Sequence, residues 1–132
     1  MKTKLFLILF LLTTLVQAEI VIVTNKKSDI TSLSKESIKY LYLAKTNKIN
    51  NIKIKALLSE DRIIHERFVN NILDKEISQY SSYWARLVFT GREPIPRRLT
   101  MEQIEEKLNE KNTIIYIDKK IINKKWKIVY EK

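Results

Sequence analysis

The sequence predicts an α/β domain in which helices flank a small, mainly parallel sheet. Two observations lead to this prediction. Short β-branched runs alternate along the chain with longer segments whose apolar residues recur at helical spacing. The resulting strand–helix–strand–helix order favours parallel strands joined by right-handed crossovers. Residues 19–132 are enough for one such domain with one hydrophobic core.

The first half of this region predicts two strands and two helices. Glu19–Thr24 has the sequence EIVIVT, a continuous β-branched run typical of a buried strand. A helix is expected from Ser34, a suitable N-cap, to about Ala44. Ile52–Leu58 begins with alternating residues and predicts a second strand. Ser59 is expected to cap the next helix, whose apolar residues recur every three or four positions.

A third helix and an extended linker come next. The segment Glu76–Thr90 carries one broad apolar face. Gly91 fits the position just after this helix, where a positive φ angle costs glycine little. The two prolines within Glu93–Arg98 prevent that segment from being helical throughout.

The last part predicts one helix and two strands. Thr100 and Gln103 have the spacing of a capping box. Thr113–Asp118 is an apolar strand, and Trp126–Tyr130 alternates as an edge strand that we expect to run antiparallel. The helix residues expected to point inward are Met101, Ile104 and Leu108.

The N-terminal segment has the layout of a secretory signal peptide. Lys2 and Lys4 precede the apolar run Leu5–Leu12, and small residues follow up to Ala18. We expect cleavage after Ala18 and an exported, periplasmic protein; an uncleaved membrane anchor is the alternative, although a span needs about 20 apolar residues. The predicted organisation is a signal peptide over residues 1–18 and one domain over residues 19–132.

The charge balance is strongly basic. The whole chain has 25 lysine and arginine residues against 15 aspartate and glutamate residues, for a formal net charge of +10. Scattered charges are typical of a solvated surface, whereas a cluster would indicate an anion, an anionic membrane or nucleic acid as partner. Lys119–Lys127 is the exception, because it contains five lysines. Export argues against nucleic acid, so no nucleic-acid partner is expected.

Composition also excludes several kinds of site. The chain has no cysteine, one histidine (His65) and one glycine (Gly91). Thiol chemistry, multi-histidine metal clusters and glycine-rich phosphate loops are therefore not expected. His65 is expected on the surface or half buried. We predict no metal site, no cofactor and no enzymatic activity.

Several segments together resemble a known family. They include the Ile38–Lys45 helix end, the YWARLVFTG run of Tyr83–Gly91, and Thr113–Asp118 in the place of a "G-A-I-G-Y-V" strand. They resemble short, single-lobe relatives of the periplasmic phosphate-binding protein of ABC importers. The resemblance implies one lobe of a type II periplasmic-binding-protein fold. It also implies that one molecule cannot close two lobes around a ligand.

The chain departs from this family where the anion would bind. The family has an Arg and a Ser-Gly-Thr signature at a helix start, where hydroxyl and N–H groups hold the oxyanion. Here Leu58 takes the place of the Arg, and Arg62–Ile64 takes the place of Ser-Gly-Thr. Ser59–Asp61 adds two carboxylates there, and Ala44 and Ile115 replace glycines.

Four residues remain as candidates for an oxyanion. Ser59 and Arg62 lie near the expected anion position, although a helix cap and a surface arginine are the alternatives. Arg97 and Arg98 could clamp a carboxylate or phosphate, unless they belong to a solvated linker.

Aromatic residues of the third helix are candidates for docking a partner. For Tyr80, Tyr83 and Trp84 the pattern favours positions in the core and at its edge, and docking of a partner by an exported lobe is the alternative. The leading functional hypothesis is an exported phosphate- or oxyanion-binding protein associated with ABC-type phosphate uptake. The alternative is a ligand-free interaction or signalling module that docks on an envelope transporter, porin or receptor. A homodimer that rebuilds a cleft is a third hypothesis.

Overall fold

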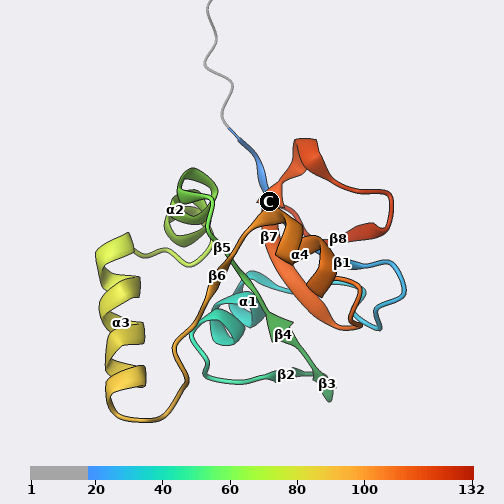
Figure 1. Cartoon of the computed structure of the whole chain (residues 1–132). Coiled ribbons are helices and arrows are strands. Elements are labelled where there is room, and N and C mark those ends of the chain that lie inside the picture. Colours follow the sequence, from blue (N-terminus) through green and yellow to red (C-terminus); the bar gives the residue numbers. More distant parts are fainter. Residues whose placement is uncertain (1–17) are drawn as a thin grey trace, which may run out of the picture.

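The computed structural model describes residues 18–132, so the predicted signal segment before Ala18 lies outside the described residues. All core side chains lie between Ile20 and Val129, and residues 19–132 therefore contain every element of the fold described here. No helix within the described part is long and apolar enough to cross a membrane. In chain order the elements are β1 (Ile20–Asn25), α1 (Lys35–Tyr42), β2 (Lys48–Ile49), β3 (Ile52–Lys53), β4 (Lys55–Ala56), β5 (Leu58–Ser59), α2 (Arg62–Asn71), α3 (Ile77–Phe89), β6 (Arg98–Leu99), α4 (Met101–Lys107), β7 (Thr113–Asp118), the 3-10 helix η3 (Lys119–Ile121) and β8 (Trp126–Tyr130) (Figure 1).

The main sheet has four strands in the order β4-β7-β1-β8. The prediction of a mainly parallel sheet is wrong in this respect, because β1 pairs antiparallel with both β7 and β8 and only β4–β7 is parallel. The error arose because a continuous apolar run indicates burial on both faces but not strand direction. The expectation that the last strand is an antiparallel edge is confirmed.

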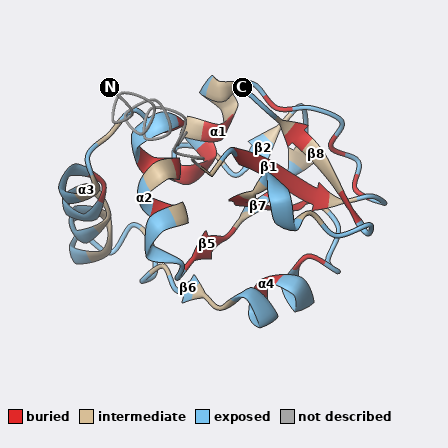
Figure 2. Ribbon diagram, turned by 90° about the horizontal axis from the view of Figure 1, so that it is seen from above, coloured by how far each residue is buried: buried red, intermediate tan, exposed pale blue. Residues whose placement is uncertain are grey.

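Helices cover both faces of the sheet. Figure 2 shows α1 and α2 on one side of β1 and β7, and α4 on the other. This two-sided cover explains why five of the six residues of each central strand are buried. Helix α3 lies at the periphery, and Tyr80 is its one buried residue. The structure is therefore a mixed α/β fold with a small sheet flanked by helices.

The second predicted strand, Ile52–Leu58, is not continuous. It is divided among β3, β4 and β5, which belong to three different sheets. Asn50 and Asn51 both have positive φ angles and form the tight turn between β2 and β3. Strands β2 and β3 thus form a small antiparallel hairpin. Of the predicted strand Ile52–Leu58, only Lys55–Ala56 joins the main sheet.

The helix termini follow the local sequence signals. Ser34 caps α1 by accepting a hydrogen bond from the Ser37 N–H. Thr100 and Gln103 form the predicted capping box of α4. Gly91 follows α3 with a φ of +73°. Met101 is 38% exposed, so its predicted inward position is wrong.

Candidate functional site at the start of helix α2 and the neighbouring cleft

Two short strands position the start of α2. Leu58 and Ser59 of β5 pair in parallel with Arg98 and Leu99 of β6. The Arg98 guanidinium extends this pairing, because Nε donates to the Ser59 carbonyl at 2.8 Å and Nη2 donates to the Glu60 carbonyl at 3.4 Å. Arg98 therefore stabilises the chain that leads into α2.

Asp61 caps α2, so the prediction that Ser59 is the N-cap is wrong. The Asp61 carboxylate accepts a hydrogen bond from the Ile64 N–H at 3.1 Å. Two residues earlier, the Ser59 hydroxyl oxygen accepts a hydrogen bond from the Asp61 N–H, also at 3.1 Å. A carboxylate of the chain itself thus occupies the helix start, where a bound anion would be stabilised by the helix dipole.

The backbone of Ser59 is also engaged. Ser59 is 6% exposed, and its N–H donates to the Tyr116 hydroxyl at 2.8 Å. The Ser59 and Asp61 N–H groups, which could have donated to an oxyanion, therefore both have partners within the fold. Glu60, exposed beside Asp61, adds a second negative charge at this end of α2.

The same Tyr116 hydroxyl contacts His65, whose Nδ1 lies 2.5 Å away. Because the Tyr116 oxygen accepts from Ser59, its proton is free to be donated to a neutral His65. Burial, and the nearby Arg98 charge, lower the pKa of His65 to about 4. Burial raises the pKa of Tyr116. Both side chains are therefore neutral at neutral pH, and they connect β7 to α2.

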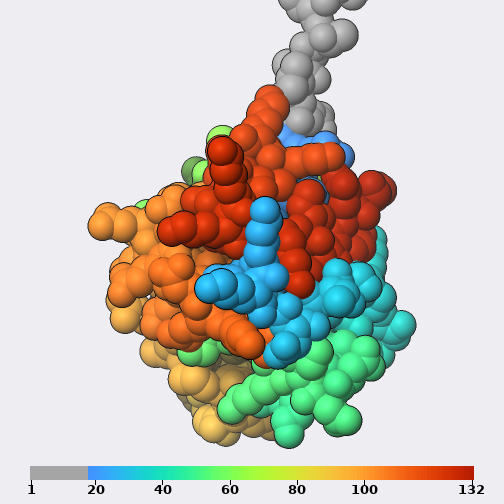
Figure 3. Space-filling view, turned by 90° about the vertical axis from the view of Figure 1, so that its right-hand side faces the viewer, coloured from blue at the N-terminus to red at the C-terminus, as the bar shows by residue number. Residues whose placement is uncertain are grey.

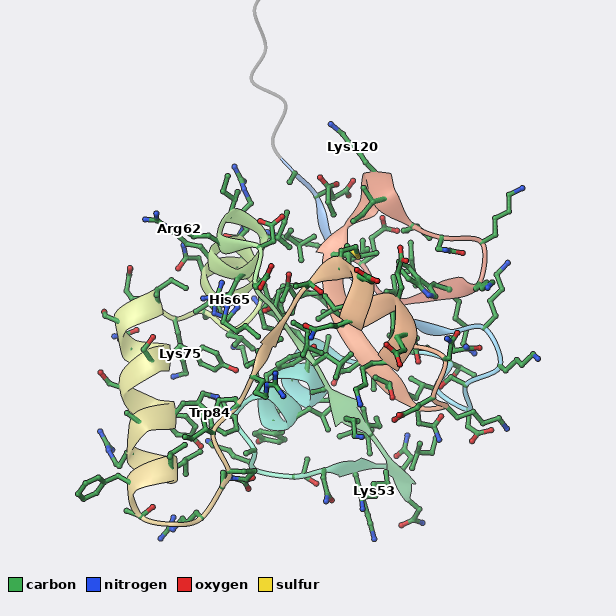
Figure 4. All side chains as sticks on the ribbon, viewed as in Figure 1. Lys53, Arg62, His65, Lys75, Trp84 and Lys120 are labelled. Carbon is green, nitrogen blue, oxygen red and sulfur yellow. The ribbon has the colours of Figure 1, made fainter. Side chains whose placement is uncertain are left out.

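His65 is 7% exposed, which contradicts the expectation of a surface or half-buried histidine. Figure 4 shows it on the side of α2 that faces the fold. It belongs to an aromatic cluster in which the Phe68 ring stacks on Tyr116 at 3.9 Å between centroids, with Tyr42 packed edge-on against Phe68. The role of Tyr116 as a polar centre was not predictable from the sequence, because its partners Ser59 and His65 lie more than fifty residues away.

The structure brings together only two of the four oxyanion candidates. Ser59 and Arg98 are bonded to each other through the Ser59 carbonyl. Arg62 is exposed on the outer side of α2 (Figure 4), and Arg97 is exposed on the linker before β6. Within residues 18–132, no group of three or more histidine, aspartate or glutamate side chains could hold a metal ion.

A cleft of about 430 Å³ lies between α1, α3, β4 and the linker that follows α3. Its walls are about equally polar and apolar, and Glu93 is the one charged residue among those that line it. No cation of the described residues faces its interior, so the cleft offers no electrostatic attraction to an oxyanion. Its lining residues are Leu41, Tyr42, Ala44, Thr46, Asn47, Ile54, Ala56, Leu58, Tyr80, Trp84, Glu93 and Pro96.

The predicted docking residues attach α3 to the end of α1. Tyr80 Oη donates to the Tyr42 carbonyl at 2.8 Å, and Trp84 Nε1 donates to the same oxygen at 3.2 Å. Tyr83 Oη donates to the Leu43 carbonyl at 2.6 Å. These bonds satisfy carbonyls that have no partner within α1. Tyr83 and Trp84 are half-buried, and Trp84 points from α3 toward α1 and the cleft (Figure 4).

Comparison with known proteins gives matches at the level of structure. No protein-family model and no curated protein matches the sequence. A structure assigned as a phosphate ABC transporter substrate-binding protein from Clostridium perfringens, with bound phosphate, superposes with a TM-score of 0.63 at 17% identity. An ABC-type phosphate transport receptor from Vibrio cholerae superposes with a TM-score of 0.62 at 16% identity.

Both similarities cover 85% of this chain but only 44% and 45% of the other proteins. This chain therefore spans less than half the length of these neighbours. At such low identity the likeness shows the fold alone, and that fold is a single lobe of the periplasmic-binding-protein type. Both neighbours are named as binding proteins or receptors rather than enzymes.

Proposed function

We propose that this protein is an exported interaction module, built on one lobe of a solute-binding fold, that docks on a protein of the cell envelope. The observation that carries the proposal is that the chain's own groups occupy the start of α2, where an anion would bind. Ser59 and Asp61 already fill it with hydrogen bonds and negative charge. An oxyanion would have to displace internal bonds and approach a carboxylate, and both cost free energy.

The surface beside the cleft supports docking of a protein segment. Phe89 at the end of α3 is 92% exposed, and Ile95, next to the cleft residue Pro96, is 74% exposed. Large apolar side chains this exposed gain free energy when a partner covers them. The half-buried Trp84 offers an aromatic wall inside the cleft. An apolar segment of another envelope protein fits this combination better than a small anion does.

Site-specific photo-crosslinking tests the proposal. A photoreactive amino acid replaces Arg92, which is exposed between Phe89 and Ile95, and as a control it replaces Glu105, which is exposed on α4. We expect a discrete adduct from position 92 in cells that produce the protein, and none from position 105. The adduct should disappear in the Phe89→Ser, Ile95→Ser double variant.

Two outcomes would contradict this proposal. Equal adducts from both positions, or an adduct that the double variant leaves unchanged, would show that this surface does not select a partner. Light scattering on residues 19–132 distinguishes a heterologous partner from a second copy, since a dimer at working concentration would favour the homodimer hypothesis.

Oxyanion binding coupled to phosphate uptake is the second candidate. It is supported by the structural likeness to a protein with bound phosphate. The exposed guanidinium groups of Arg62 and Arg97 are the groups left to hold an anion, because Arg98 is bonded to backbone carbonyls. Saturable phosphate binding that Arg62→Ala weakens would favour this candidate over docking.

A further inference from the structure

Two connections that are far apart in the sequence place exposed lysines on one face of the molecule. One is the turn after β1, and the other joins β7 to β8. Figure 3 faces this surface, with the turn in blue beside the red C-terminal segment. The exposed lysines are Lys26, Lys27, Lys119, Lys120, Lys124 and Lys125.

Backbone contacts hold the two connections together. The Lys26 N–H donates to the Lys125 carbonyl at 2.9 Å. Lys127 lies between them, half-buried, and its Nζ donates to the Ser28 carbonyl at 2.9 Å. Asn112 Oδ1 accepts from the Ser28 hydroxyl at 2.7 Å and fixes the other side of the turn. Lys26, Lys27 and Lys125 therefore project from segments that are hydrogen-bonded to each other.

Little negative charge neutralises this surface. Of its exposed lysines, only Lys119 forms an ion pair with a described residue, Glu131. Asp118 and Asp29 lie nearby and keep their negative charges, because their hydrogen-bond donors, the Lys120 N–H and the Asn112 side chain, are neutral. Six exposed lysines outnumber these two acids and Glu131, so the surface directs a net positive field at solvent.

An apolar side chain lies next to two of these lysines. Ile121 in η3 is 50% exposed and follows Lys120 directly. The Lys119 N–H donates to the Glu19 carbonyl at 2.9 Å, so η3 lies against the start of the described chain. Figure 4 shows Lys120 pointing away from the fold at this end. This end of the surface therefore lies beside the start of the described residues.

We propose that this lysine face binds the anionic headgroups of a phospholipid bilayer, with Ile121 entering the interface. Lysines spread over two connections form no pocket for one small anion, but they match the diffuse negative charge of a lipid surface. An apolar residue among basic ones adds burial to this attraction. The proposal is independent of what the cleft binds.

Vesicle co-sedimentation tests this inference on residues 19–132, which contain all described elements but lack the apolar N-terminal segment. The probes are vesicles of phosphatidylglycerol mixed with phosphatidylcholine, and vesicles of phosphatidylcholine alone. We expect binding to the mixed vesicles only. Binding should weaken steeply between about 0.05 M and about 0.5 M salt, because the charges are exposed.

Variants test whether this particular face is responsible. Each lysine near an anionic surface contributes about five-fold in affinity, so replacing Lys26, Lys27, Lys124 and Lys125 with Gln should weaken binding by nearly three orders of magnitude. Ile121→Ser should weaken it by about five-fold. The matched control removes the same charge elsewhere, by replacing Lys45, Lys75, Arg86 and Arg92 with Gln.

The control variant should lose less than about five-fold in affinity, since only general attraction is reduced. Equal losses in the two variants would overturn the proposal, because net charge rather than this face would then be responsible. Binding to phosphatidylcholine alone would overturn it too. Failure to bind the anionic vesicles would do the same, and would leave an acidic protein as the occupant to test.

Discussion

The neutral state of His65 makes stability depend on pH in a defined range. Its ring is buried, and Nδ1 lies against the Tyr116 hydroxyl at 2.5 Å. Protonation would replace an accepted hydrogen bond with a buried positive charge near Arg98. We therefore expect acidification to destabilise the fold before most carboxylates titrate.

The magnitude follows from the two pKa values. The pKa of His65 is about 4 in the fold and 6.5 when unperturbed. Because the folded pKa is lowered, the unfolded state binds more protons between these values, and stability is full above 6.5 and falls as the pH drops toward 4. Between about pH 7 and about pH 5.5 the free energy of unfolding should decrease by about 1.2 kcal/mol.

Two assays measure this effect. Urea unfolding at both pH values gives the free-energy difference directly, and His65→Asn, which retains an acceptor near the Nδ1 position, should lose most of the pH dependence. Since His65 is the single histidine, its ring proton NMR signals need no assignment and should titrate near pH 4. A midpoint near 6.5, or equal pH dependence in the variant, would refute the reasoning.

Three further substitutions test individual contacts by urea unfolding. The Tyr42 hydroxyl is buried without a hydrogen-bond partner among the described residues, so Tyr42→Phe should raise stability by about 1 kcal/mol; a loss would contradict this. Tyr83→Phe removes the bond to the Leu43 carbonyl and should lower stability by about 1 kcal/mol; no change would show that this bond is dispensable. Thr100→Ala breaks the α4 capping box and should also cost about 1 kcal/mol, whereas a neutral result would mean that α4 is held by packing alone.

Features that depend on neighbouring residues were predictable from the sequence. Ser34 and the Thr100–Gln103 pair cap their helices as expected, because an N-cap acts within one turn. Gly91 ends α3 as expected, since its positive φ is a local requirement. The resemblance to one lobe of a phosphate-binding protein also predicted the fold that the structural comparison shows.

Features that depend on distant residues were not predictable. The antiparallel pairing of β1 with β7 joins residues about ninety positions apart, and nothing in either apolar run encodes its direction. Ser59 and His65 both bond to the Tyr116 hydroxyl, and nothing in the sequence around either residue indicates this shared partner. Asp61 caps α2 in place of the predicted Ser59, because Ser59 belongs to the two-residue strand β5, which pairs with β6.

Calorimetric titration of phosphate into residues 19–132, with sulfate as the control anion, tests the central claim most directly. That claim is that the chain's own groups, chiefly Ser59 and Asp61, close the start of α2 to oxyanions. We predict no saturable heat with a Kd below about 1 mM for either anion. Saturable phosphate binding that Arg62→Ala weakens would contradict the claim and would establish an oxyanion site at this helix start.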